Sequence, residues 1–239
     1  MSAGGLRRIT LEDTLLSPST QPVPDPKLHA LLTRLGEEGW EMWAQWDREV
    51  RHDRWHSFVA AEYDRVLAVL TELRRPGMRF LELGSATGII TIMADLLGYD
   101  ACGIEIDERL VYMAREVAIR YGSRARFATG SFLPQGWAWR PRDGDGRLGT
   151  IGEGVSGYLE LGVPLDEFDL VYAYPWGGEE AAMLDLLRAH GSPETRLLLH
   201  LVSGELRLMH RGRIERAWPA PQGLGTTAPD DRLHPRRSS

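Results

Sequence analysis

Between residues 78 and 202, short apolar runs alternate with longer segments of helical spacing, and this alternation limits the possible folds more than any other feature of the chain. Because a strand followed by a helix returns the chain to the same edge of a sheet, the pattern predicts a mostly parallel α/β sheet covered by helices on both faces. The predicted strands are 78–83, 101–106, 125–129, 168–173 and 196–202, and the predicted helices between them are 89–97, 108–121 and 179–190.

The segment that precedes this alternation divides into three parts. Residues 1–26 end in a proline-rich stretch, which predicts a flexible arm because proline has no backbone N–H. Leucine and tryptophan at helical spacing predict a helical N-terminal extension over 27–57, interrupted between Gly36 and Gly39. A stronger helix is expected from about residue 58 to residue 75, and we expect one α/β domain to span 58–217.

Two later segments lie outside the regular alternation. Residues 135–167 form a Gly-rich insertion, and a structureless loop of that length is uncommon in a compact domain. We therefore expect a hairpin within the insertion, over about 148–161, and treat the insertion as a candidate lid. The tail over 218–239 is rich in proline and has few apolar residues, which predicts disorder.

Composition restricts the partners and the compartment. The chain of 239 residues carries a net charge of −6 without a long basic block, so a nucleic-acid partner is unsupported. Cys102 is the single cysteine, which excludes an internal disulfide bond and fits a reducing cytoplasm. No run of 18 apolar residues and no signal peptide is visible, so we expect a cytoplasmic protein that does not contact a membrane.

The most informative segment joins the first predicted strand to the following helix, from Glu82 to Gly88. It places an acid at the end of the strand and small residues in the turn, where a ligand can approach the backbone and the unpaired N–H groups of the helix. Glu105 follows Gly84 by 21 residues, at the end of the second strand, where an acid can accept the hydroxyl protons of a ribose. The two acids and the turn are therefore expected to meet in one crevice.

With these residues, the sequence over about 58–202 resembles the class I, seven-strand methyltransferases that use S-adenosylmethionine. The resemblance implies a doubly wound, Rossmann-like sheet and S-adenosylmethionine as the cofactor. Ala86 replaces the central glycine of the family's first motif, and Ser131 stands where many members carry an aspartate. The implied cofactor contacts are Glu82 for the methionine ammonium, Gly84, Ser85, Ala86, Thr87 and Gly88 beneath methionine and ribose, Glu105 and Ile106 at the ribose, and Gly130, Ser131 and Phe132 around the adenine.

A nicotinamide dinucleotide is the competing ligand for a turn of this kind. Its fingerprint requires a third glycine one position after Gly88, where this chain has Ile89. The sequence therefore favours S-adenosylmethionine over a dinucleotide, and a purely structural turn is the third alternative.

The loop after the fourth strand faces the methyl group in this family, and here it contains Tyr174, Pro175 and Trp176. It resembles the Asn/Asp-Pro-Pro-Tyr/Trp/Phe loop of amino-methylating members, so that Ala173 falls at the amide position. The usual pair of acceptors for an amine is then incomplete. The resemblance implies acceptor contacts from Tyr174, Pro175, Trp176 and Glu179.

No catalytic base can be assigned from these residues, because methyl transfer depends mainly on alignment of the acceptor and removal of water. Glu179 and Glu180 are candidates for an amine acceptor, with capping of the following helix as the alternative. His200 lies in an apolar strand, where a hydrogen-bonded core residue is more common than a catalyst. His52 and His56 fit a solvated turn better than a lid.

Metal and substrate signals are weaker. No metal-ligand spacing is convincing, and the stretch over 143–146 fits a turn better than a calcium loop. The N-terminal tryptophans, Trp40, Trp43, Trp46 and Trp55, are expected to pack against the sheet, with walls of an acceptor site as the alternative. The residues Phe58, Val59 and Tyr63 resemble a helix that covers the cofactor in some protein-lysine methyltransferases.

The end of the domain departs from the family. Typical members place a helix and then two strands after the fifth strand, whereas this chain continues with strand-like runs over 205–210 and 213–218. We expect a hairpin there and an abbreviated C-terminal sheet edge. The leading hypothesis is a methyltransferase with a small-molecule or protein acceptor, followed by a non-catalytic S-adenosylmethionine-binding or interaction module and then by a nicotinamide-dependent oxidoreductase.

Overall fold

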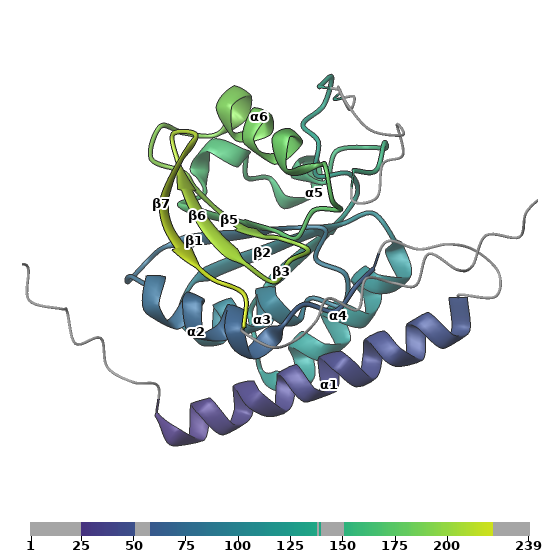
Figure 1. Cartoon of the computed structure of the whole chain (residues 1–239). Helices are drawn as coiled ribbons and strands as arrows, with labels where there is room; N and C mark the ends of the chain where they lie inside the picture. The colour runs from purple at the N-terminus through teal and green to yellow at the C-terminus, as the bar shows by residue number, and fades with distance from the viewer. Residues whose placement is uncertain (1–24, 51–57, 138, 140–150, 222–239) are drawn as a thin grey trace, which may run out of the picture.

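The computed structural model describes residues 25–50, 58–137, 139 and 151–221, and its centre is a seven-stranded sheet (Figure 1). The strands lie in the order β3-β2-β1-β4-β5-β6-β7. The first five strands of the chain pair in parallel, and β6 and β7 pair antiparallel. The strands are β1 (Arg79–Leu83), β2 (Asp100–Glu105), β3 (Arg126–Thr129), β4 (Leu170–Ala173), β5 (Arg196–His200), β6 (Leu206–His210) and β7 (Arg213–Trp218).

Helices cover both faces of the sheet, which confirms the predicted doubly wound, mostly parallel α/β fold. In Figure 1, α2, α3 and α4 lie below the sheet with α1 beneath them, and α5 and α6 lie above it. Each face has its own apolar core, because the side chains of buried strands alternate between the two faces. The helices are α1 (Pro26–Val50), α2 (Tyr63–Leu73), α3 (Ile89–Leu96), α4 (Glu108–Tyr121), α5 (Tyr158–Leu161) and α6 (Glu180–His190), with a 3-10 turn at Leu165–Glu167.

The N-terminal extension differs from its prediction in three respects. α1 begins at Pro26, inside the predicted arm, and continues without interruption through Gly36 and Gly39. A Cβ atom at Gly39 would lie 2.8 Å from Cε2 of Tyr63, so this glycine lets α1 approach α2 closely instead of ending a helix. α2 begins at Tyr63 and not near residue 58, and residues 58–62 precede it without regular structure.

The predicted hairpin in the insertion is wrong for the part of it that the structure describes, and residues 148–150 lie outside that part. The chain near residue 156 pairs with the end of β3 instead of with itself: Ser131 N–H donates to Val155 O, and Gly157 N–H donates to Ser131 O, both at 2.8 Å. α5 follows directly. The insertion is therefore attached to the sheet next to the carboxyl end of β3.

The C-terminal hairpin is confirmed, and no helix separates β5 from β6. The sheet edge is nevertheless not short of strands, because β6 and β7 bring the total to seven, so the predicted abbreviation is limited to the missing helix. Trp218 ends β7, and its Nε1 lies 3.2 Å from Oε2 of Glu72, which ties the start of the predicted tail to α2. The remaining predicted arm, 1–24, and tail, 222–239, lie outside the described residues.

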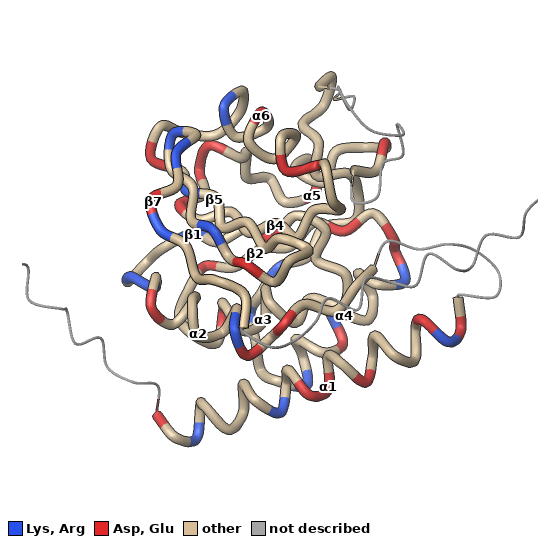
Figure 2. Tube along the Cα trace, viewed as in Figure 1, with Lys and Arg blue, Asp and Glu red and all other residues tan. Residues whose placement is uncertain are grey.

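Charged side chains are mixed over the surface. Figure 2 shows acidic and basic positions interspersed along the helices and along β7. Within the described ranges, no helix is both long enough and apolar enough to cross a membrane.

Candidate active site

A cavity of about 990 Å³ lies at the carboxyl ends of the central strands. β1 and β4 are neighbours in the sheet, but the helices that follow them cover opposite faces, and ligands of open α/β sheets bind at such a switch point. Of the fifteen predicted site residues, all except Gly88 and Glu179 line this cavity. The predicted residues that do so are Glu82, Gly84, Ser85, Ala86, Thr87, Glu105, Ile106, Gly130, Ser131, Phe132, Tyr174, Pro175 and Trp176.

The turn after β1 is held by the neighbouring strand. The N–H groups of Gly84 and Ser85 both donate to the carbonyl of Ile104, at 2.9 and 3.0 Å. Gly84 has a φ of 73°, and Ala86 has a φ of 45°, in the left-handed region that favours glycine. Ala86 therefore keeps the backbone path that its motif position requires, although it carries a side chain.

Gly88 has a packing role in this structure and does not line the cavity. It precedes α3 with a φ of 75°, and a Cβ atom there would lie 2.6 Å from the ring of Phe127 and 2.8 Å from Cβ of Ala114. This glycine thus allows the start of α3 to pack against β3 and α4. Its predicted contact with the ligand stays a prediction.

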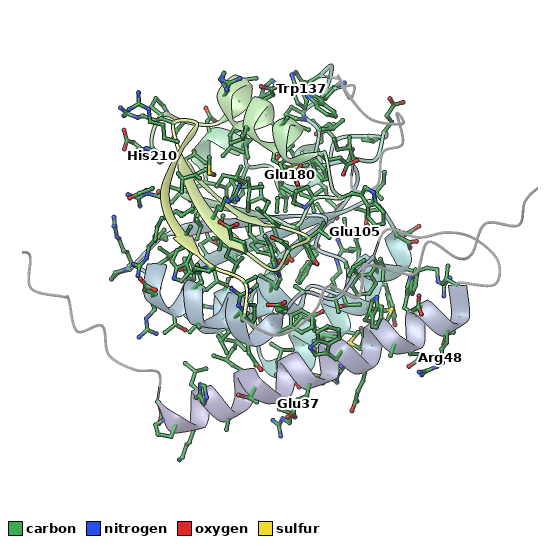
Figure 3. All side chains as sticks on the ribbon, viewed as in Figure 1. Glu37, Arg48, Glu105, Trp137, Glu180 and His210 are labelled. Atoms are coloured by element: carbon green, nitrogen blue, oxygen red, sulfur yellow. The ribbon has the colours of Figure 1, made fainter. Side chains whose placement is uncertain are left out.

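Glu105 ends β2 and points into the interior of the fold (Figure 3). Its two carboxylate oxygens accept hydrogen bonds from the N–H groups of Ala86 and Asp107, both at 2.9 Å. Burial raises the pKa of this carboxyl group, and the hydrogen bonds from the backbone oppose the rise. The acid therefore holds the turn while it lines the cavity.

Glu82 lies deeper than Glu105, with an exposed fraction of 5%. Its Oε2 accepts hydrogen bonds from the N–H and the hydroxyl of Thr91, at 2.9 and 2.5 Å. Burial raises the pKa of Glu82 to about 8, against these hydrogen bonds and with a smaller contribution from the charge of Glu105. A buried carboxyl group of this kind has a strong electrostatic preference for a cationic ligand.

The segment after β3 forms the wall next to Glu105. Gly130 has a φ of 149°, and a Cβ atom there would lie 2.5 Å from the carbonyl oxygen of Val155. The hydroxyl of Ser131 donates to the carbonyl of Gly152 at 2.5 Å and accepts from the N–H of Leu133 at 3.1 Å. Ser131 therefore organises the backbone around the cavity.

The loop after β4 presents Tyr174, Pro175 and Trp176 to the cavity, but not Ala173. Ala173 is buried in the core beneath α6, on the other face of the sheet. A side chain at residue 173 points away from the cavity, so this position offers no group to an acceptor in the cavity. Tyr174 is the first residue of this loop that faces the cavity.

Glu179 is buried at the start of α6 and does not line the cavity. Its N–H donates to the carbonyl of Trp176 at 3.0 Å, which closes the turn between loop and helix. The carboxylate of Glu180 accepts the N–H of Gly178 at 2.9 Å. The carboxylate of Glu180 therefore contacts the turn before α6, whereas Glu179 makes no side-chain capping hydrogen bond there. The predicted acceptor contact of Glu179 stays a prediction.

His200 supports the cavity from behind. Its Nδ1 lies 3.0 Å from the hydroxyl of Tyr172, and its ring stacks on Tyr174 with 4.3 Å between centroids. Burial, together with the charge of Arg65, lowers the pKa of His200 to about 4, so the imidazole is neutral near pH 7. Tyr172 lines the cavity, and His200 does not.

A tryptophan of α1 and the segment that leads into α2 form a further wall of the cavity. The residues of this wall are Trp46, Phe58, Val59 and Tyr63. Trp40 is exposed, and Trp43 donates a hydrogen bond from Nε1 to the carbonyl of Phe58 at 3.1 Å. The resemblance of Phe58, Val59 and Tyr63 to a cofactor-covering segment was the available signal. Further lining residues without any sequence signal are Ala61, Ile104, Asp107, Leu110, Gly152, Tyr172, Gly177, Val202 and Ser203.

Several weaker predictions fall on residues that the structure does not describe. His52, His56, Trp55 and the stretch over 143–146 lie there. Over the described ranges, no group of three His, Cys, Asp or Glu residues is arranged to hold a metal ion.

The site residues fit S-adenosylmethionine in the chemistry of their groups. The cavity is at the upper end of the size range of ligand pockets, which leaves space for a second molecule. Buried Glu82 suits an ammonium group, and Glu105 stands at the end of β2, where ribose hydroxyls are bound in Rossmann-like folds. The left-handed turn at Gly84 brings backbone close to the space between them.

No family model matches the chain. A curated relative, ribosomal protein L11 methyltransferase from Thermus thermophilus, is 30% identical over 133 residues, which cover 56% of this chain and 42% of the relative. The match thus spans less than half the length of that relative.

Solved structures with similar folds include two that contain S-adenosyl-L-homocysteine. An RNA methyltransferase from Salinibacter ruber is 23% identical, with a TM-score of 0.39 over 56% of this chain and 73% of the other. A SAM-dependent methyltransferase from Thiobacillus denitrificans is 18% identical, with a TM-score of 0.41 over 64% of this chain and 53% of the other.

Proposed function

We propose that this chain is a cytoplasmic S-adenosylmethionine-dependent methyltransferase. One observation carries the proposal: the turn after β1, the acids that end β1 and β2, and the aromatic loop after β4 line one continuous cavity. The similarity to the L11 methyltransferase supports it over the matched residues. Transfer between two bound molecules requires that the cofactor-binding part and the acceptor-binding part of the cavity adjoin each other.

When bound, S-adenosylmethionine would supply a methyl group carried on sulfur. The lone pair of the acceptor forms the new bond to the methyl carbon, and the electron pair of the broken S–CH3 bond stays on sulfur. Any proton of the acceptor leaves to solvent. In the proposal, Glu82 pairs with the ammonium group and Glu105 holds the ribose hydroxyls. Tyr174 and Trp176 align the acceptor and exclude water from the reacting atoms. No residue is required as a strong base.

A non-catalytic S-adenosylmethionine-binding module remains the alternative. Residue 173 supplies no amide or carboxylate, and no helix separates β5 from β6, although the sheet has seven strands. The dinucleotide alternative still requires a glycine at Ile89, whose side chain is buried and lines the cavity.

Calorimetric titration of the full chain with S-adenosylhomocysteine tests the proposal. We expect saturable binding to the wild type and at least about tenfold weaker binding to Glu82→Gln, which removes the partner of the ammonium group. Glu116→Gln, on the exposed face of α4, is the matched control. Absence of binding at millimolar ligand, or tighter binding of NADH, contradicts the proposal.

A further inference from the structure

The cavity has two chemically different sides, and the order of the strands separates them. The sheet order places β2 on one side of β1 and β4 and β5 on the other. All carboxylates among the described lining residues, namely Glu82, Glu105 and Asp107, follow from β1 and β2. The ends of β4 and β5 contribute no acid and no base: they contribute Tyr172, Tyr174, Pro175, Trp176, Gly177, Val202 and Ser203.

The rim of the cavity is apolar and exposed. Val59, Trp176 and Val202 line the cavity and have exposed fractions of 47%, 37% and 56%. Trp176 and Val202 lie in the loops after β4 and β5, on the uncharged side, and Val59 lies in the stretch before α2. Ile106, after β2, also lines the cavity and is 47% exposed, so one exposed apolar residue lies on the acidic side. Large apolar side chains that gather at the mouth of a cavity while exposed to water mark a binding surface.

Charged residues close in sequence to Val59 and Val202 form ion pairs. Glu62 and Arg65 form an ion pair at 2.7 Å, and Arg65 also donates to the carbonyls of Gly204 and Pro219. Glu205 and Arg207 form a second pair, with 2.8 Å between Oε1 and Nε. None of these four side chains lines the cavity, so an anion that entered here would meet no lysine, arginine or histidine among the described lining residues.

Taking the proposed methyltransferase function as its basis, we infer that the acceptor is an uncharged, mainly apolar small molecule that enters between Val59, Trp176 and Val202. On this side of the cavity, an anionic acceptor would lose its hydration without gaining a cation. Tyr172, Tyr174 and Ser203 carry the side-chain hydroxyls on this side. The volume of about 990 Å³ fits a cofactor and a small molecule.

The test uses two probes of the same size that differ in charge, β-naphthol and β-naphthoate. Each is titrated by calorimetry into the full chain saturated with S-adenosylhomocysteine. We expect β-naphthol to bind at least about tenfold more tightly than β-naphthoate, since only the acid must desolvate a charge without a partner. Equal or tighter binding of β-naphthoate, or no binding of either probe, overturns the inference.

Two matched variants locate the binding site. Val202→Asp is expected to weaken β-naphthol at least about tenfold and to leave S-adenosylhomocysteine binding unchanged. Ile214→Asp, on β7 outside the cavity, is the control because its exposed fraction of 55% matches the 56% of Val202. Equal affinity of both variants for β-naphthol overturns the inference. If the wild type does not bind S-adenosylhomocysteine, the proposed function is contradicted. Failure of the inference about the acceptor is thus distinguishable from failure of the proposed function.

Discussion

The N–H of Ala86 donates to Oε2 of Glu105 across 2.9 Å, so the acid that ends β2 holds the turn that follows β1. The other oxygen of Glu105 accepts from Asp107, which caps α4 through its own side chain. One carboxylate thus joins the turn, the end of β2 and the start of α4. Ligand binding and local folding depend on the same group.

Replacement of Glu105 is therefore expected to affect both properties. Glu105→Ala leaves two N–H groups without their acceptor, and we expect the free energy of unfolding to fall by about 2 kcal/mol. Binding of S-adenosylhomocysteine should weaken at least about tenfold. Glu105→Gln keeps one acceptor oxygen and should lie between alanine and wild type in both measurements. Urea unfolding and calorimetry measure the two effects, with Glu116→Ala as the exposed control; a variant as stable as that control would contradict the holding role.

Ala86 offers a stabilising substitution. Its φ of 45° is unfavourable for a residue with a side chain, and glycine removes that cost while adding flexibility to the unfolded chain. We expect Ala86→Gly to raise the free energy of unfolding by roughly 1 kcal/mol or less and to retain ligand binding. Gly88→Ala is the contrast: its new Cβ would lie 2.6 Å from the ring of Phe127, and we expect a loss of about 2 kcal/mol or more. Thermal and urea unfolding compare them, and a destabilised Ala86→Gly would show that the turn is not strained.

Glu82 predicts a pH dependence in the absence of ligand. Its folded pKa of about 8 lies above the ordinary 4.5, so between these values the folded state binds more protons than the unfolded state. Stability then falls as pH rises through this window, by roughly a few kcal/mol. Glu82→Gln cannot ionise and should lose this decline. The measurement is urea unfolding at several pH values from 5 to 8, and equal slopes for variant and wild type would contradict the prediction.

The sequence predicted the sheet well because local signals determine its parts. α4 has the predicted bounds, since Asp107 caps its beginning and Gly122 ends it with a φ of 66°. The prediction failed where contacts between residues far apart in the sequence determine the structure. Gly39 predicts a helix interruption locally, but its role is close packing against Tyr63 of another helix, which the local sequence does not indicate. The path near Ser156 depends on pairing with Ser131, which no local pattern indicates.

The candidate site shows the same division. The acids and the turn were predictable because they adjoin strand ends, whereas the rim residues Val59 and Val202 belong to no motif. The motif did not indicate which way the Ala173 side chain points. Side chains alternate along β4, so Tyr172 and Tyr174 share one face of the sheet and Ala173 lies on the other.

His200 predicts a decline in stability in acid. Its folded pKa of about 4 lies below the ordinary 6.5, so the unfolded state binds its proton first as pH falls, and stability declines from 6.5 toward 4. His200→Phe keeps an aromatic ring against Tyr174 but leaves the hydroxyl of Tyr172 without its partner. We expect a loss of about 1–3 kcal/mol near pH 7 and a smaller decline in acid. Urea unfolding at pH 7 and pH 5 measures the loss of stability and its pH dependence. If the stability of His200→Phe falls between pH 7 and pH 5 as much as that of the wild type, His200 is not the cause of the decline.

Trp176 distinguishes a methyltransferase from a binding module. It lines the cavity from the loop after β4 with an exposed fraction of 37%, so truncation should not disturb the core. We expect Trp176→Ala to bind S-adenosylhomocysteine as the wild type does, because the ligand's predicted contacts lie at β1, β2 and β3. Transfer of labelled methyl to an uncharged acceptor should fall at least about tenfold in kcat/KM, since the aromatic plane that aligns the acceptor is lost. Trp176→Phe should recover most of the rate. Transfer by Trp176→Ala at the wild-type rate would show that this loop does not form the acceptor site.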